Sequence, residues 1–295
     1  MINRKDAAAC LLALAGLVGA FGARAQAPAD SDGVLRVCAD PNNPPLSDRN
    51  QDGFENKIAA LVARELGWKL EYVWWPQRMG FVRNTLRARD PEHDERYKCD
   101  LVIGVGFPSE ITASTRPYYR STWVAVFRKG VGLDGVRTAD DFLNLEPARL
   151  KSLRFGYFAG TPPTDWLLGH HLFDQGTFYA PQSGDPTVYP GQLVDRELMS
   201  GKIDVAFVWG PIGGYYARNS HSPELLLAPF PPDKDHHFDF PIAMGMRFGE
   251  KAWRDRIDAL VAGKKAEIDA ILGTYGVPLV DEDGRLLPLP LTAAN

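Results

Sequence analysis

Several features that would define a function are scarce or missing in this 295-residue sequence. Only three cysteines are present, and one of them, Cys10, lies in the first 25 residues. Acidic residues outnumber basic ones by 37 to 33, and this net charge of −4 gives no electrostatic support for binding nucleic acid. Beyond residue 25 no apolar run is long enough to span a bilayer, so we expect no membrane span.

Catalytic motifs are also absent. The sequence contains no G-x-S-x-G nucleophile elbow, no H-E-x-x-H zinc motif and no Walker loop. Hydrophobic residues make up 45% of the chain, which argues for a folded core and against disorder. We therefore expect a folded binding protein that is not an enzyme, with no catalytic residues, no metal site and no cofactor.

The first 25 residues predict a cleavable signal peptide. Arg4 and Lys5 give a positive start, residues 7–22 carry no charge, and residues 23–25 (ARA) offer a small-x-small cleavage site. Cys10 precedes the leucine-rich centre instead of ending it, which argues against a lipid anchor. We expect a mature chain exported to the periplasm.

Strand and helix patterns alternate through the mature chain. A buried strand is predicted at residues 34–40, and the segment FENKIAALVARELG from Phe54 predicts an amphipathic helix. The apolar face of that helix contains Ile58, Leu61, Val62 and Leu66. Asp52 and Glu55 fit a capping box at its start, and Gly67 fits its end.

A strand at 69–75, a helix at 78–88 and an apolar strand at 99–105 complete a β-α-β-α-β unit, which is typical of a parallel, helix-covered sheet. A further strand at 122–130 leaves this unit. The pattern then restarts near Arg154 with a strand, a turn and a helix.

The pattern predicts an α/β fold of two lobes, each a parallel-core sheet covered by helices, linked by a two-strand hinge. The expected lobe I comprises residues 34–128 plus 240–280, and lobe II comprises 131–238. Residues 281–295 form a C-terminal tail. A ligand cleft is expected between the lobes, at the carboxyl ends of the strands.

The order of segments resembles the periplasmic solute-binding proteins of the amino-acid type, whose fold is the type II periplasmic binding protein. The segments concerned are LRVCADPNNPPLSDRNQDGFENKIAALVARELG, TRPYY, AGT and GKIDVAFV. Two charged residues that this family uses are missing. An arginine that clamps the ligand carboxylate is replaced by Pro108, and an aspartate that pairs with the ligand ammonium is replaced by Trp209. Since neither replacement can bind a charged group in the same way, the site does not suit a free amino acid.

A narrower resemblance fits these departures. The stretches WWPQR, RPYYRST and VWGPIGGYY are similar to the MxaJ/XoxJ family, which comprises solute-binding-protein-like periplasmic proteins associated with quinoprotein methanol dehydrogenases. The resemblance implies an accessory role in methanol oxidation, by binding the dehydrogenase or by helping it mature. Its partners would be a calcium- or lanthanide-dependent dehydrogenase, together with the associated cytochrome c system. We favour the lanthanide-associated branch, although no residue separates the two.

Twelve residues are candidates for lining the ligand or partner cleft. They are Asp40, Asn42, Asn43, Trp75, Arg78, Phe107, Arg116, Tyr118, Gly160, Thr161, Trp209 and Tyr215. Trp209 and Trp75 could stack on a flat ligand. Gly160 and Thr161 begin a helix, where free backbone N–H groups suit an anion, although Thr161 as a simple helix cap is an equal alternative.

Two other patterns have structural alternatives. SDRNQDGFEN resembles the first half of a calcium loop, but its twelfth position is Ala59 and supplies no ligand, so we interpret the segment as an edge of the cleft. An exported compartment permits a disulfide between Cys38 and Cys99. Their expected offset on neighbouring strands, roughly 13 Å, argues against it, and the sequence leaves the question open.

Three functions therefore remain. The first is an accessory protein of a methanol dehydrogenase. The second is the binding protein of a transporter for a small solute that is not an amino acid. The third is a cleft enzyme with Glu110 as general acid, because a few relatives of this fold are dehydratases, but an isolated glutamate gives that hypothesis little support.

Overall fold

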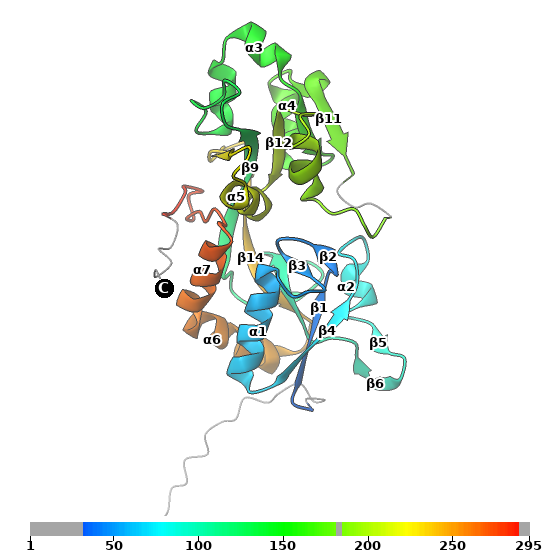
Figure 1. Ribbon diagram of the computed structural model, residues 1–295. Coiled ribbons are helices and arrows are strands. Elements are labelled where there is room, and N and C mark those ends of the chain that lie inside the picture. The colour runs from blue at the N-terminus through cyan, green and yellow to red at the C-terminus, as the bar shows by residue number, and fades with distance from the viewer. Residues whose placement is uncertain (1–31, 181–184, 289–295) are drawn as a thin grey trace, which may run out of the picture.

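Two α/β lobes joined by two long strands make up the molecule, which confirms the predicted architecture (Figure 1). The computed structural model describes residues 32–180 and 185–288, so the predicted signal peptide lies outside the described residues. The connecting strands are β9 (Tyr119–Arg128) and β14 (Asp239–Met246). We keep the exact lobe boundaries given above as a proposal.

Lobe I contains most of the N-terminal half and the C-terminal helices. Its strands are β1 (Val34–Ala39), β2 (Asn42–Asn43), β3 (Ser47–Asp48), β4 (Lys69–Trp74), β5 (Arg89–Asp90), β6 (His93–Tyr97), β7 (Leu101–Gly106) and β8 (Ala113–Ser114). Its helices are α1 (Phe54–Leu66), α2 (Phe81–Asn84), α6 (Lys251–Gly263) and α7 (Lys265–Thr274). Residues 89–98 contain the β5–β6 hairpin, which projects from this lobe (Figure 1).

Lobe II is built from the middle of the chain. Its strands are β10 (Phe155–Phe158), β11 (Gly176–Tyr179), β12 (Val205–Trp209) and β13 (Leu225–Pro229). Its helices are α3 (Pro147–Ser152), α4 (Pro162–Gly169) and α5 (Gly210–Asn219), with short helical segments η1 (Ala139–Asn144), η2 (Phe173–Gln175) and η3 (Leu193–Leu198).

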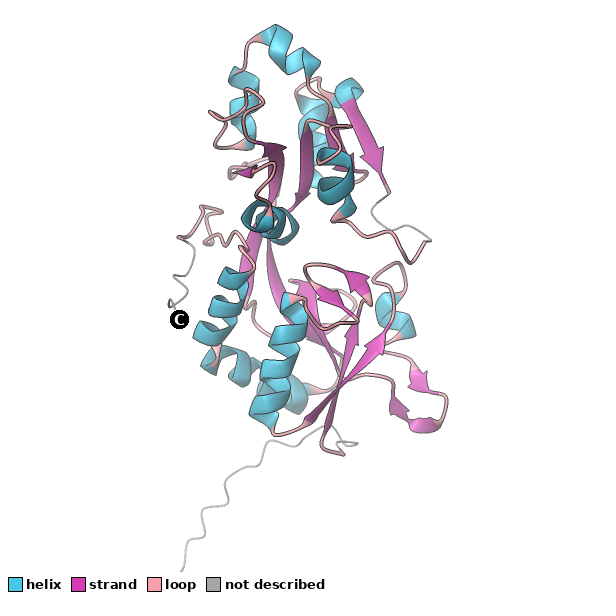
Figure 2. Ribbon diagram, viewed as in Figure 1, coloured by secondary structure: helices cyan, strands magenta, loops and turns pink. Residues whose placement is uncertain are grey.

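One continuous sheet path crosses both lobes, in the order β11-β10-β12-β9-β14-β7-β1-β4. Figure 2 shows long strands running from one lobe into the other. Strand β1 is parallel to β4 and β7, and β10 is parallel to β11 and β12. The first residues of β9 pair with β14, and its later residues pair with β12 and β13, all antiparallel. The parallel strands of each lobe therefore end next to the hinge, where the sequence predicts the cleft.

Helix α1 keeps its predicted face and end but starts differently. Ile58, Leu61 and Val62 are buried, and Gly67 ends the helix in the left-handed region at φ 69°. The expected capping box of Asp52 and Glu55 is wrong. The helix is capped at Gly53, whose N–H donates to Oδ1 of Asn56 at 3.2 Å.

Each lobe has its own aromatic core. In lobe I, Trp253 of α6 is buried and stacks on Trp68, with ring centroids 5.6 Å apart. In lobe II, Phe155 stacks on Phe207 at 5.5 Å, and Trp166 meets Phe207 edge-on at 5.7 Å. These rings fix the helices on the sheet faces, so the cleft residues stand on rigid elements.

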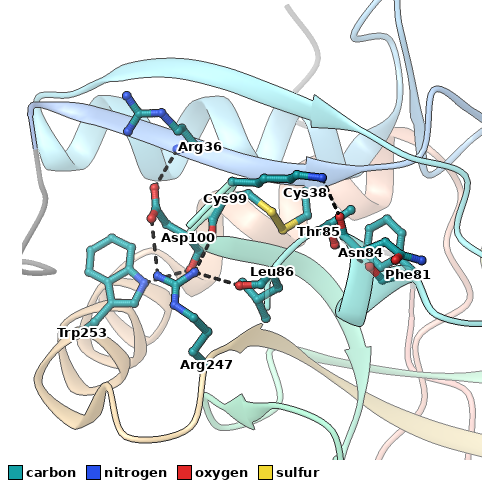
Figure 3. Close-up of a disulfide and its surroundings, with 11 residues drawn as sticks. Arg36, Cys38, Phe81, Asn84, Thr85, Leu86, Cys99, Asp100, Arg247 and Trp253 are labelled. Atoms are coloured by element: carbon teal, nitrogen blue, oxygen red, sulfur yellow. Dashed lines mark hydrogen bonds and ion pairs between the residues drawn. A yellow bond between two sulfur atoms is a disulfide. The ribbon is translucent and has the colours of Figure 1, made fainter. Parts of the chain in front are cut away.

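The structure contains the Cys38–Cys99 disulfide, with Cα atoms 5.6 Å apart, and the offset argument against it is wrong (Figure 3). That argument assumed that Cys99 continues an extended strand. Instead the chain bends before β7, where the N–H of Lys98 donates to Ala88 O and that of Asp100 donates to Arg36 O. The bend brings Cys99 beside Cys38.

Arg247 secures the same corner from the C-terminal part of lobe I (Figure 3). Its buried guanidinium donates to the carbonyls of Leu86 and Cys99, and lies 3.5 Å from the carboxylate of Asp100. Its Nε donates to Glu250 at 2.6 Å. A buried arginine is stable here because several acceptors replace the water that it loses.

We expect reduction of the disulfide to lower the free energy of unfolding of the mature chain by about 2 to 4 kcal/mol, because the bridge closes a long loop of the unfolded chain. Its cysteines are 61 positions apart. Urea denaturation with and without reductant measures the effect. A Cys38→Ser/Cys99→Ser variant should match the reduced protein and ignore reductant, whereas equal midpoints for oxidised and reduced wild type would contradict the expectation.

Candidate functional site

The lobe I wall of the cleft is held together by Asp40, directly after β1. Its carboxylate accepts hydrogen bonds from the N–H groups of Asn42 at 2.8 Å and Gln77 at 2.5 Å. The bond to Asn42 lies within the loop that follows β1. The bond to Gln77 joins this loop to the segment that follows β4. Asp40 is thus committed to positioning two loops at one edge of the sheet.

Two residues of this wall reach lobe II. Nδ2 of Asn42 donates to Pro186 O at 3.0 Å, and the guanidinium of Arg78 donates to Asp185 O at 2.6 Å. Both acceptors are backbone carbonyls of the segment before η3. These hydrogen bonds join the two lobes beside the strand ends, and the assignment of both residues to a cleft stays a prediction.

Asn43, Trp75 and Phe107 occupy the same side. Nδ2 of Asn43 approaches Gln77 Oε1 at 3.4 Å, whereas its buried Oδ1 has no hydrogen-bond partner among the described residues. Trp75 and Phe107 are each 40% exposed. Large half-exposed aromatic rings are more typical of a binding surface than of a core.

An aromatic group lies next to the hinge, at the base of the predicted cleft. Trp209 ends β12, and its ring lies 6.1 Å from that of Trp123 on β9 and 6.0 Å from that of Phe240 on β14. Tyr215 of α5 stacks on Tyr275 at 6.0 Å. Trp209 therefore contacts both hinge strands, whereas Tyr215 packs against the C-terminal end of α7.

The structure does not bring Arg116 or Tyr118 to the cleft, and these two predictions are corrected. Arg116 forms an ion pair with Asp258 of α6, with Nη2 2.7 Å from Oδ2. Tyr118 is 1% exposed, and its hydroxyl donates to Ile103 O at 3.1 Å inside the core of lobe I. Both lie just before β9, where the chain still packs on lobe I.

The proposed anion site at Gly160 and Thr161 also fails in its chemistry. Helix α4 begins with Pro162 and Pro163, and proline has no N–H, so two of its first backbone donors are missing. The hydroxyl of Thr161 donates to Phe158 O at 2.6 Å. Gly160 has a φ of 71°, so its role is to turn the chain before the helix.

No cluster of three or more metal-ligating side chains occurs within residues 32–180 and 185–288. In the segment that resembles a calcium loop, Asp48 Oδ1 accepts from the N–H of Asp52 at 3.2 Å. The helices in the described part of the chain include none long and apolar enough to cross a membrane.

The sequence analysis also gave Glu55 the wrong role. Its side chain is buried beneath Gly104 of β7, where an added Cβ would lie 2.2 Å from Oε1. Burial, assisted by the negative charge of Asp40, raises the pKa of Glu55 from 4.5 to about 7. The signal available in the sequence was its place in the first turn of a helix that packs against a cleft strand.

We expect Glu55→Gln to stabilise the protein at high pH. Between about pH 4.5 and 7 the unfolded chain ionises Glu55 while the folded chain keeps its proton, so wild-type stability falls with rising pH across that window. Above pH 7 the variant should be more stable by up to about 3 kcal/mol, and at about pH 4 the two should be similar.

Denaturant titrations at several pH values measure this difference. The matched control is Glu110→Gln, because Glu110 is an exposed acid, and its curve should follow wild type. A Glu55→Gln variant less stable than wild type at about pH 8 would show that the ionised carboxylate is stabilised in the fold.

Comparison with known proteins agrees with this geometry. No family model matches the sequence. The MoxJ protein of Methylorubrum extorquens is 32% identical over 289 residues, covering 93% of this chain and 91% of that protein. The crystal structure of the periplasmic binding protein XoxJ from Methylobacterium extorquens AM1 is 37% identical, with a TM-score of 0.67, and covers 84% of this chain and 100% of that chain.

MxaJ from Methlophaga aminisulfidivorans MPT is also similar in structure, with a TM-score of 0.67 at 23% identity over 83% of this chain and all of that chain. The two lobes, the shared hinge strands and the parallel strands of each lobe define a type II periplasmic binding protein fold. Within that class, the chain belongs to the MoxJ/XoxJ/MxaJ family, the one its sequence resembles.

Proposed function

We propose that this protein is a periplasmic accessory protein of a quinoprotein methanol dehydrogenase, which it binds or helps to mature. The observation that carries the proposal is the aromatic base of the cleft. Trp209 stands where amino-acid binders carry an aspartate, and it is held between Trp123 and Phe240. An indole offers no counter-ion to an ammonium group, which supports a partner other than a free amino acid.

The opposite side of the cleft supports the same proposal. Pro108, which stands in place of the carboxylate-binding arginine, directly follows the half-exposed ring of Phe107. Trp75 and Phe107 give the lobe I rim an aromatic surface. Exposed aromatic rings with nearby arginines are enriched where proteins bind other proteins.

Family membership supports the link to methanol oxidation, since the relatives are MoxJ, XoxJ and MxaJ. The solved XoxJ and MxaJ structures are 37% and 23% identical to this chain, and the lanthanide-associated branch stays a prediction from the sequence resemblance. The N-terminal leader pattern supports periplasmic export. The same reasoning makes binding, rather than catalysis, the proposed activity, and the associated cytochrome c system is a further candidate partner.

Calorimetry of the mature chain with the methanol dehydrogenase of its host tests the proposal. We expect micromolar or tighter binding, stronger to the apo enzyme than to the metal- and quinone-loaded enzyme if the role is maturation. Trp75→Ala/Phe107→Ala should weaken it by about 10-fold or more, because a few large side chains contribute most of the binding energy of an interface. The matched control is Phe178→Ala on β11, a 67% exposed ring in lobe II outside the cleft.

Absence of binding heat with either form of the enzyme would contradict a stable complex. Equal losses in the cleft variant and in Phe178→Ala would contradict the cleft as the docking surface. Both results leave the family assignment intact, because that assignment rests on sequence and fold.

One observation favours the transporter alternative. Asn42 and Arg78 bond across the cleft to Pro186 and Asp185, as lobes closing over a small solute would do. Native mass spectrometry of the purified mature chain distinguishes the two functions. A retained small molecule, lost in Trp209→Ala, would favour solute transport over the accessory role.

A further inference from the structure

Lobe I contains a cavity of about 580 Å³ that is separate from the aromatic base of the cleft. It lies between the start of α2 and the end of β7, lined by residues 77–83 on one side and 104–106 on the other, with Ser109 and Ile111 at its edge. Neither Trp209 nor Phe240 lines it. Its volume is within the range of cavities that hold small organic molecules.

Three arginines converge on this cavity, and its lining contains no aspartate or glutamate. Arg83 and Arg87 are exposed, and their guanidinium groups form no hydrogen bond or ion pair with other described residues. The third, Arg78, donates to Asp185 O. This local charge is unusual because acidic residues outnumber basic ones in the chain as a whole.

The floor of the cavity is apolar. Phe81, Val82 and Val102 are buried there, and they belong to the cluster that packs around the disulfide. Met79, which is 90% exposed, and Ile111, which is 56% exposed, lie at the mouth. The cavity therefore combines a fixed hydrophobic surface with guanidinium groups along one side.

Arginines without a partner also occur on fully solvated surfaces, where an ion pair with a ligand contributes little binding free energy. Two features distinguish this site from that case. The guanidinium groups border a cavity, and the apolar floor would bury the body of a ligand whose charged end they pair with. Arginine matches carboxylate and phosphate geometry by paired N–H donors, and its plane also stacks on flat rings.

We propose that this cavity binds an organic anion with an apolar body, which places its carboxylate or phosphate against Arg83 and Arg87 and its body over Phe81 and Val102. The site takes a ligand class that the aromatic cleft base does not select. It operates whether or not the protein also binds a dehydrogenase.

Calorimetry with naphthalene-2-carboxylate tests the proposal on the mature chain, with the neutral 2-naphthylmethanol as the matched ligand. We expect the carboxylate to bind at least about 10-fold more tightly than the alcohol, because hydrogen bonds to charged groups are the stronger kind. Raising the salt concentration should reduce that ratio.

Arg83→Gln/Arg87→Gln should remove most of the preference for the carboxylate. The charge-matched control is Lys151→Gln/Lys234→Gln, which removes two exposed positive charges outside the cavity and should keep the preference. Circular dichroism and thermal melts establish that each variant is folded.

Filling the cavity provides a second test that leaves the charges in place. Gly106 lines the cavity, and an added Cβ there meets nothing within 4 Å, so Gly106→Leu should fit while occupying ligand space. It should weaken both ligands. Three results would overturn the proposal: dissociation constants weaker than about 1 mM for the carboxylate, equal affinity for carboxylate and alcohol, or unchanged carboxylate affinity in the double arginine variant.

Discussion

The antiparallel pairing of β9 with β14 is the constraint on which the rest of the structure depends. Four residue pairs, from Tyr119 opposite Ile242 to Thr122 opposite Asp239, join the lobes. Ser121 is fully buried there and donates its hydroxyl to Pro278 O at 2.6 Å, and Arg120 pairs with Asp239. Because both strands also belong to the sheets of the lobes, this short ladder fixes where the parallel strand ends face each other.

Close packing at the hinge also decides which residues form the base of the cleft. Gly210 approaches the backbone so tightly that a Cβ would lie 2.3 Å from Thr122 O, so β12 and α5 can join beside β9 only through glycine. That junction sets Trp209 against Trp123 of β9 and Phe240 of β14. The aromatic base is therefore part of the hinge itself, and a change in the angle between the lobes would move all three rings.

Much of the fold was predictable because it depends on local patterns. Apolar patterns predicted α1, the parallel strands of lobe I and the strand that leaves that lobe, and Gly67 marked the end of α1. The Cys38–Cys99 bridge was misjudged because it depends on a bend at residues 98–100, which hydrogen bonds to Ala88 and Arg36 produce. Such contacts join segments distant in sequence and leave no periodic signal.

Individual site residues were harder to predict than the cleft itself. Asp40, Asn42 and Arg78 follow strand ends, and position relative to a strand end is readable from sequence. Arg116 and Tyr118, by contrast, precede a strand. The direction of their side chains depends on α6 and on the core of lobe I, which the local sequence does not reveal. Glu55 was assigned to a cap because its spacing from Asp52 fits one, whereas Asn56 takes that role and leaves the glutamate buried under β7.

The arrangement of charge separates this protein from binding proteins that hold a zwitterion. Arg247, one of two buried arginines among the described residues, is occupied by acceptors in the disulfide corner. The acids on the cleft side include a loop-bonded Asp40 and a Glu55 that burial keeps largely neutral below pH 7. An ammonium group at the cleft base would meet indole and phenyl rings there. Under the proposed function, selectivity comes from shape, aromatic contact and Arg78 at the cleft edge, which suits an apolar partner surface that carries negative charge.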